Sequence, residues 1–219
     1  MLTQIYGLTT VADTVEVDRL QPDHIGVVLD EGIETWDRVD AATAIEIARA
    51  IENARLVALS LSTDPDRVLM TAELLNPAIV HLARAHEMTP ALLASLRNRL
   101  APRELMLTVP VRDQESISLA VRLEAFADYL LLDTSHPSTG IVGATGLAHD
   151  WALSAKIAAV ASRPVVLAGG LGPDNVTEAI CRVRPAGVDS ETRTSRADHR
   201  RRKDLPKVEA FIAVARCAL

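Results

Sequence analysis

A carboxylate and a pair of glycines stand at the ends of two short apolar runs in the second half of the chain. The run over residues 129–132 ends at Asp133, and the run over 165–168 ends at Gly169 and Gly170. Short apolar runs of this kind are typical of buried strands. An acid at a strand end can exchange protons with a ligand, and glycine amides before a helix start can approach a phosphate closely. The two runs therefore predict a site for a small phosphorylated molecule at one sheet edge.

The composition favours a small-molecule partner. The 219 residues are 48% hydrophobic, which is enough to bury one sizeable core. A net charge of -6, with only two Trp, two Tyr and two Phe, argues against a nucleic-acid surface. No apolar run is long enough to span a bilayer, and the N-terminal region is acidic where a signal peptide would be apolar. We expect one cytoplasmic domain over residues 1–219, without nucleic-acid or membrane partners.

The two cysteines carry no pattern that indicates a bridge or a metal site. Cys181 and Cys217 are isolated, and neither belongs to a group with metal-ligand spacing. We expect both thiols to be packed and unreactive, with no metal bound.

Short apolar runs alternate with longer amphipathic segments at a spacing of roughly 25 to 30 residues, which is typical of repeated βα units. The predicted strands are Leu2–Tyr6, His24–Leu29, Leu56–Leu61, Ile79–Leu82, Leu105–Val109, Tyr129–Leu132, Val165–Ala168 and Ala186–Val188. Eight such units predict a closed, eight-stranded parallel barrel. A doubly wound open sheet is the alternative, but it would show five or six strands and a glycine fingerprint after the first strand.

Three amphipathic segments are predicted as outer helices of this barrel. Residues 41–51 and 90–100 each place apolar side chains on one face. The last segment, residues 205–219, presents Val208, Phe211, Ile212 and Ala215 on its inner face.

Several short motifs occur in a fixed order along almost the whole chain. They are Gln4–Thr9, His24–Gly26, Leu131–Thr134, Gly143–Gly146, Asp150–Trp151, Leu167–Leu171, Asn175–Val176, Gly187–Asp189 and Lys203–Asp204. In this order they resemble the phosphoribosylanthranilate isomerase family. The stretch from residue 130 to 189 carries the most specific part of the resemblance.

The resemblance implies a TIM (βα)8 barrel that catalyses an Amadori rearrangement in tryptophan biosynthesis, without a cofactor. In that family a carboxylic acid after the sixth strand opens the sugar ring, and a thiol after the first strand removes the C2 proton. Asp133 matches the acid position, and burial beside Leu131 and Leu132 is expected to raise its pKa. The alternative is that Asp133 only caps the following loop.

Two substitutions depart from the family pattern at the positions of chemistry. Tyr6 replaces the thiol base, and a phenol with an ordinary pKa of about 10 is a poor base at neutral pH. Tyr6 therefore either acts with a lowered pKa or fills the pocket. After the second strand, residues 30–36 are acidic and lack the Arg that holds the anthranilate carboxylate in the family. The fourth-strand Gln-Leu-His-Gly pattern has become His81-Leu-Ala-Arg84, with His81 expected to be a hydrogen-bonded core residue.

The phosphate site implied by the resemblance is also altered. Its predicted residues are Gly143, Gly146, Gly169, Gly170, Ser190 and Arg193. Glu191 stands where the family has a small residue, and its charge disfavours a phosphate. Arg193 opens a basic run that ends at Lys203, and one of these side chains can supply the missing contact or the run can be solvated surface.

Three functions fit these observations. The chain can be a phosphoribosylanthranilate isomerase with an altered site, a related barrel enzyme for a different sugar phosphate, or a noncatalytic ligand-binding or partner protein. In each case the expected ligand is a small-molecule sugar phosphate, and the protein is expected to be a monomer or homodimer.

Overall fold

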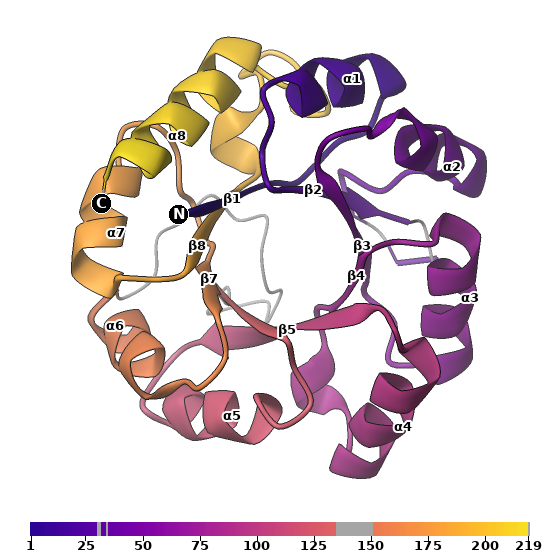
Figure 1. The fold of residues 1–219 in the computed structure, drawn as a ribbon, viewed down its shortest axis with the longest axis vertical. Helices are drawn as coiled ribbons and strands as arrows, with labels where there is room; N and C mark the ends of the chain where they lie inside the picture. The colour runs from indigo at the N-terminus through magenta and orange to yellow at the C-terminus, as the bar shows by residue number, and fades with distance from the viewer. Residues whose placement is uncertain (30–31, 34, 135–150, 219) are drawn as a thin grey trace.

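The structure is a computed structural model that describes residues 1–29, 32–33, 35–134 and 151–218. Its strands form a closed barrel in the order β1 to β8, and every neighbouring pair is parallel. Figure 1 shows the ring of strands at the centre, with the helices arranged around its outside. The predicted closed barrel is confirmed, and the open sheet is excluded because β1 pairs with β8.

The strands are β1 (Leu2–Ile5), β2 (His24–Val28), β3 (Arg55–Ser60), β4 (Ile79–Leu82), β5 (Glu104–Val111), β6 (Tyr129–Thr134), β7 (Val165–Leu167) and β8 (Gly187–Ser190). The helices are α1 (Val11–Arg19), α2 (Ala41–Ala50), α3 (Pro65–Leu75), α4 (Pro90–Leu100), α5 (Glu115–Leu123), α6 (Trp151–Val160), α7 (Val176–Val183) and α8 (Leu205–Cys217). Two short 3-10 helices, η1 (Ala85–Glu87) and η2 (Thr192–Thr194), complete the described elements.

All eight predicted strands are present, with ends that differ by at most two residues from those expected. The largest extensions are of two residues and lie at the ends of β5, β6 and β8. In the first two, Pro110 and Val111 pair with Asp133 and Thr134. The sequence pattern stopped β6 at the last apolar residue, but backbone pairing does not depend on side-chain polarity. Asp133 is consequently held inside a strand and not in a loop.

Alternate strand residues point into the barrel or out to the helices. In β6, Leu130 and Leu132 pack in the large cluster that includes buried helix residues, whereas Leu131 belongs to a separate cluster. That inner cluster contains Tyr6, Val57, Ile79, Met106, Leu131, Val166 and Ala168. The barrel interior is therefore filled by apolar side chains, and polar inward residues meet beside them.

The predicted inner face of the last helix is confirmed. Val208, Phe211, Ile212 and Ala215 of α8 are all buried. The helix begins with an N-cap at Asp204, whose side chain accepts a hydrogen bond from the Lys207 amide. None of the helices within the described residues is long and apolar enough to cross a membrane.

The expectation that both cysteines are packed is wrong. Cys181 and Cys217 are free thiols, and both are exposed. Helix α7 buries Val176, Ala179, Ile180 and Val183, which places Cys181 on the opposite face. Cys217 lies at the end of α8, beyond its last buried residue. Apolar character alone did not reveal which helix face each thiol occupies.

A buried carboxylate secures the connection between α2 and β3. Asp18 of α1 is only 3% exposed and accepts hydrogen bonds from the amides of Glu52, Asn53 and Ala54. Burial by itself would raise the pKa of Asp18, but these donors outweigh it and lower the pKa. The ionised carboxylate therefore acts as a backbone acceptor for a loop that has no secondary structure of its own.

Replacing Asp18 by Ala is expected to lower the free energy of unfolding by about 1–3 kcal/mol, because buried amides lose their acceptor. Urea unfolding at neutral pH measures the change. Asp66→Ala is the matched control, since the Asp66 side chain is 86% exposed and its removal should cost less than about 0.5 kcal/mol. Equal losses in the two variants would contradict the assignment.

Candidate active site

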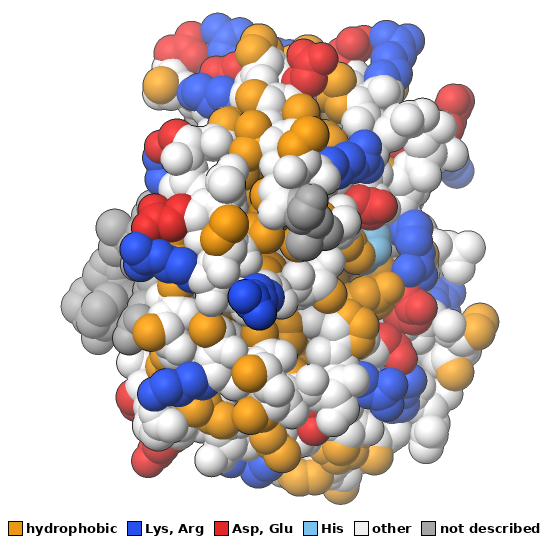
Figure 2. All heavy atoms as spheres, turned by 60° about the vertical axis from the view of Figure 1, so that its left-hand side comes forward, with side chains coloured by type: hydrophobic (Ala, Val, Ile, Leu, Met, Phe, Trp, Pro, Cys, Tyr) orange, Lys and Arg blue, Asp and Glu red, His pale blue; other side chains and the backbone are white. Residues whose placement is uncertain are grey.

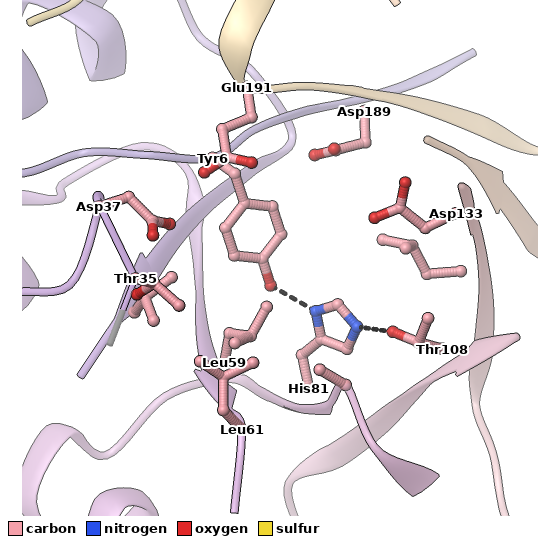
Figure 3. Close-up of a pocket in the computed structure, with 13 residues that line it drawn as sticks. Tyr6, Thr35, Asp37, Leu59, Leu61, His81, Thr108, Asp133, Asp189 and Glu191 are labelled. Atoms are coloured by element: carbon pink, nitrogen blue, oxygen red, sulfur yellow. Dashed lines mark hydrogen bonds between the residues drawn. The ribbon is translucent and has the colours of Figure 1, made fainter. Parts of the chain in front are cut away.

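A cavity lies at the C-terminal end of the barrel, where polar side chains follow the strands. Tyr6, His81 and Thr108 line one part of it, and the carboxylates of Asp37, Asp133, Asp189 and Glu191 line another. Figure 3 shows these side chains converging from different strands and the loops that follow them. The remaining lining is apolar and comes from Val28, Leu59, Leu61, Ala83 and Leu131, with Thr35 at the edge. The cavity therefore combines proton-exchanging groups with a low-dielectric wall.

Asp133 enters this cavity from β6. Burial raises the pKa of its carboxyl to about 7, although a hydrogen bond of 2.6 Å from the Thr134 amide acts in the opposite direction. The direction and cause of the shift are those expected from the sequence. A carboxyl with this pKa exists in both protonation states near neutrality, which suits proton transfer.

Tyr6 is held by a chain of hydrogen bonds. Its Oη lies 2.7 Å from His81 Nδ1, and His81 Nε2 lies 2.7 Å from Thr108 Oγ1 (Figure 3). Burial lowers the pKa of His81 to about 3, so the imidazole is neutral. Burial, followed by the charges of Asp189 and Glu191, raises the pKa of Tyr6 well above its usual value. Tyr6 therefore keeps its proton, and its hydroxyl is hydrogen-bonded to His81 Nδ1.

The Tyr6 ring also fills space at the barrel mouth. A Cβ added at Gly26 would lie 2.2 Å from two atoms of the ring, so the ring depends on a glycine in β2. Gly7 has a φ of +76° and packs against the side chains of Trp36 and Glu191. Of the two interpretations that the sequence left open, this geometry favours a phenol that fills the pocket over a phenolate base.

Two carboxyl groups meet near the Tyr6 ring. Asp37 follows β2 and is 4% exposed, while Glu191 follows β8. Burial, the charge of Asp37 and a hydrogen bond to Asp37 raise the pKa of Glu191 well above its usual value. The hydrogen bond between Glu191 and Asp37 thus favours the protonated form of Glu191. This pair makes the cavity acidic after β2, where the family has an Arg that this chain lacks.

Four of the predicted phosphate-site residues gather at the ends of β7 and β8. Gly169 and Gly170 have φ values of +85° and +66°, a conformation that favours glycine. Ser190 Oγ donates to the Leu171 carbonyl at 2.7 Å, and Arg193 donates to the Gly170 carbonyl at 3.3 Å. These four residues lie together, but none is among the described residues that line the Asp133 cavity. Gly143 and Gly146 lie outside the described residues.

Arg193 is already engaged in this structure. Its Nη2 atom lies 2.5 Å from Asp174, which neutralises its charge. The amide of Gly172 donates to Asn175 Oδ1, so this amide is also occupied. A phosphate would therefore have to replace existing contacts.

The rest of the basic run contacts the protein itself. Arg202 forms two hydrogen bonds of 2.8 Å to Asp13, and Arg201 donates to the carbonyls of Trp36 and Arg38. The Arg200 guanidinium lies 4.2 Å from the centroid of the Trp36 ring. The sequence suggested either ligand contacts or solvated surface for this run. The structure shows instead that it joins the β8–α8 connection to α1 and to the β2–α2 loop.

Lys203, the last residue of this run, is buried. Its Nζ donates to the Glu191 carbonyl at 2.9 Å and to Ser195 Oγ at 3.2 Å. Burial lowers the pKa of Lys203 to about 8, although the charges of Glu191 and Asp189 oppose this. The amine supports the loop that carries Glu191 from outside the cavity.

Sequence reasoning did not select Asp37, Thr108 or Asp189 as site residues. Asp189 offered a signal, since it follows an apolar strand just as Asp133 does. Asp37 and Thr108 offered none, because each reaches the cavity only through tertiary packing. His81 was expected to be a hydrogen-bonded core residue, and this is confirmed. Among the described residues, no group of three or more His, Cys, Asp and Glu is placed to hold a metal ion.

Comparisons with known proteins agree with this fold. The family model described as N-(5'-phosphoribosyl)anthranilate (PRA) isomerase matches residues 3–213. The N-(5'-phosphoribosyl)anthranilate isomerase of Haloferax volcanii is 32% identical over 216 residues, covering 98% of this chain and 93% of the relative. The enzyme of the same name from Pseudomonas putida is 29% identical and covers 99% and 98%.

Solved structures of the same family have the same fold over nearly the whole chain. The phosphoribosyl anthranilate isomerase of Thermotoga maritima superposes with a TM-score of 0.82 at 24% identity, covering 99% of this chain and 98% of the other. The enzyme from Thermococcus kodakaraensis gives a TM-score of 0.78 at 28% identity, with 99% of both chains covered. From the match over residues 3–213 and the relatives of similar length, the chain belongs to the N-(5'-phosphoribosyl)anthranilate isomerase family.

Proposed function

We propose that this protein is an isomerase that carries out the Amadori rearrangement of a phosphoribosylated amine, with phosphoribosylanthranilate of tryptophan biosynthesis as its substrate. The observation that carries the proposal is Asp133, a carboxyl with a pKa of about 7 that lines the cavity of a barrel belonging to this family. A structure of a family member is in complex with reduced 1-(o-carboxyphenylamino)-1-deoxyribulose 5-phosphate, which shows a ligand of this class for that protein.

Asp133 supplies the proton that opens the sugar. Its protonated carboxyl donates to the ring oxygen while the C1–O bond breaks, and the nitrogen lone pair forms the C1=N bond. The low-dielectric wall beside Asp133 favours the protonated acid before this step. The reaction as proposed uses no cofactor.

The phosphate is proposed to bind at the ends of β7 and β8. Gly169 and Gly170 have positive φ values and no side chain that would keep a phosphate from their backbone, and Ser190 and Arg193 lie beside them. Arg193 can exchange its contact with Asp174 for a phosphate oxygen, which is a stronger charge-assisted partner for a guanidinium. Gly143 and Gly146 belong to the same proposed site.

A second candidate function is the same rearrangement on a substrate without the anthranilate carboxylate. The observation that favours it is the Asp37–Glu191 pair, together with the lack of any Lys or Arg among the described residues that line the cavity. A ligand carboxylate placed near Asp37 would be repelled more strongly in this low-dielectric site than in water. A neutral substituent would not carry that cost.

The protein is proposed to act in the cytoplasm on a small sugar phosphate, as one domain over residues 1–219. One relative, from Thermotoga maritima, is named as a dimeric enzyme whose monomers were also generated. For this chain, a monomer or a homodimer stays a prediction.

Asp133→Asn is expected to reduce kcat for phosphoribosylanthranilate by about 10²–10⁴-fold, since an amide cannot protonate the ring oxygen. Loss of anthranilate fluorescence with purified protein measures the rate. Asp66→Asn, at an exposed position, serves as the control and should be unchanged. Wild-type turnover no faster than buffer would remove the proposal for this substrate.

Tyr6→Phe is expected to change kcat by less than about tenfold, because the raised pKa of Tyr6 keeps its proton on the phenol and out of the reaction. The same fluorescence assay measures it. A loss comparable with that of Asp133→Asn would show that the phenol transfers protons after all.

Asp37→Asn is expected to lower KM for phosphoribosylanthranilate by about tenfold or less, since it removes a repulsive charge. KM for N-(5-phosphoribosyl)aniline, which lacks the carboxylate, should stay constant. A lower KM of the wild-type enzyme for the anthranilate compound than for the aniline compound, with no decrease in Asp37→Asn, would argue against the second candidate.

A noncatalytic binding protein would be favoured if pentose phosphates raised the melting temperature but neither compound was turned over.

A further inference from the structure

Asp133 and Asp189 lie at one level of the barrel, separated by a single strand. Leu132 pairs with Leu167, and Leu167 pairs with Val188, so the next residues in β6 and β8 are also level. The residue between them is Ala168, which packs in the inner cluster. Figure 3 shows the two carboxyl groups facing each other across one side of the cavity.

The same level continues into β1 and β2 and fixes the orientation of Asp189. Gln4 pairs in register with both Asp189 and His24. Gln4 Nε2 donates to Asp189 Oδ1 at 3.2 Å, and Gln4 Oε1 lies 3.1 Å from His24 Nδ1. His24 therefore sets which end of the Gln4 amide faces Asp189. Within the described residues, Asp189 Oδ2 has no hydrogen-bond partner.

The environment of Asp189 suits proton exchange. Burial and the charge of Asp133 raise the pKa of Asp189 to about 8, whereas the Gln4 hydrogen bond and the charge of Lys203 act against the rise. Tyr6 and Glu191 also face this group, and the pKa of each is raised. Asp133 and Asp189 are coupled carboxyls that share a proton near neutrality, and the reactive arrangement is the one that has this proton on Asp133 and leaves Asp189 ionised.

We propose that Asp189 is the catalytic base of this enzyme and removes the C2 proton of the ring-opened substrate. The inference rests on the proposed isomerase function. It gives the role of the family's missing thiol to a carboxylate in β8, the strand that pairs with β1. Tyr6, which occupies the thiol position, is hydrogen-bonded to His81, and its raised pKa keeps the phenol protonated and so unsuited to act as a base.

Asp133 and Asp189 together supply and accept every proton that the rearrangement moves. Asp133 gives its proton to the ring oxygen, and the C1=N iminium forms. Asp189 takes the proton from C2, the C–H electron pair forms C1=C2, and the C=N electrons return to nitrogen. The enol then gives its O2 proton to Asp133 while Asp189 returns a proton to C1, which yields the ketose and restores both carboxyls.

Asp189→Asn tests this assignment, because an amide retains the hydrogen bond from Gln4 but cannot accept the C2 proton. The expected result is a loss in kcat of about 10²–10⁴-fold with KM little changed, and loss of the pH-rate limb that belongs to the base. With substrate deuterated at C2, wild-type enzyme should show a primary isotope effect, and ring opening should persist in the variant without loss of deuterium. The matched comparison is Asp133→Asn, which should block ring opening itself.

An Asp189→Asn enzyme with near wild-type kcat and an unchanged pH profile would overturn the inference while leaving the isomerase function intact. Failure of wild-type enzyme to turn over any phosphoribosylated amine would instead overturn the proposed function. If Asp189→Asn does not fold, Asp189→Ala with added formate replaces it. Rescue of the rate by formate supports the carboxylate base, and a folded variant that is active without formate refutes it.

Discussion

The pairing of β1 with β8 is the interaction on which the rest of the structure depends. It closes the barrel and brings Gln4 beside Asp189, although 185 residues separate them along the chain. Once the ring is closed, the register of each strand fixes the level of every inward side chain. The cavity is therefore a consequence of backbone pairing, and its side chains cannot move apart without opening the sheet.

Several carboxyl groups in one cavity lose hydration and repel one another when they are ionised, and the surrounding structure offsets part of this cost. Asp133, Asp189 and Glu191 all have raised pKa values, mainly because burial disfavours their ionised forms. Proton uptake relieves the repulsion, Gln4 provides a donor, and Lys203 provides a nearby cation. These compensations keep protons available in the cavity, which is the property that an acid–base enzyme requires.

The departures from the family pattern are connected to one another in space. Tyr6 at the thiol position contacts His81, which itself replaces the expected fourth-strand residue. The Asp37–Glu191 pair joins the acidic segment after β2 to the altered turn after β8. Arg200 and Arg201 hold the β2–α2 loop through the ring and carbonyl of Trp36. Matched changes of this kind indicate a remodelled cavity with its own set of contacts, in contrast to the scattered loss of single residues.

The amino-acid sequence determined the barrel, its eight strands and the position of Asp133 at the end of the sixth strand. Apolar periodicity and the order of motifs can be found in the sequence without knowledge of any tertiary contact. It also indicated that the thiol and the Arg are missing. It did not determine that Tyr6 is hydrogen-bonded to His81, that the basic run binds other parts of the chain, or that Asp189 lies beside Asp133. Those relations join residues far apart in the chain, and only the register of the closed barrel and the burial it creates decided them.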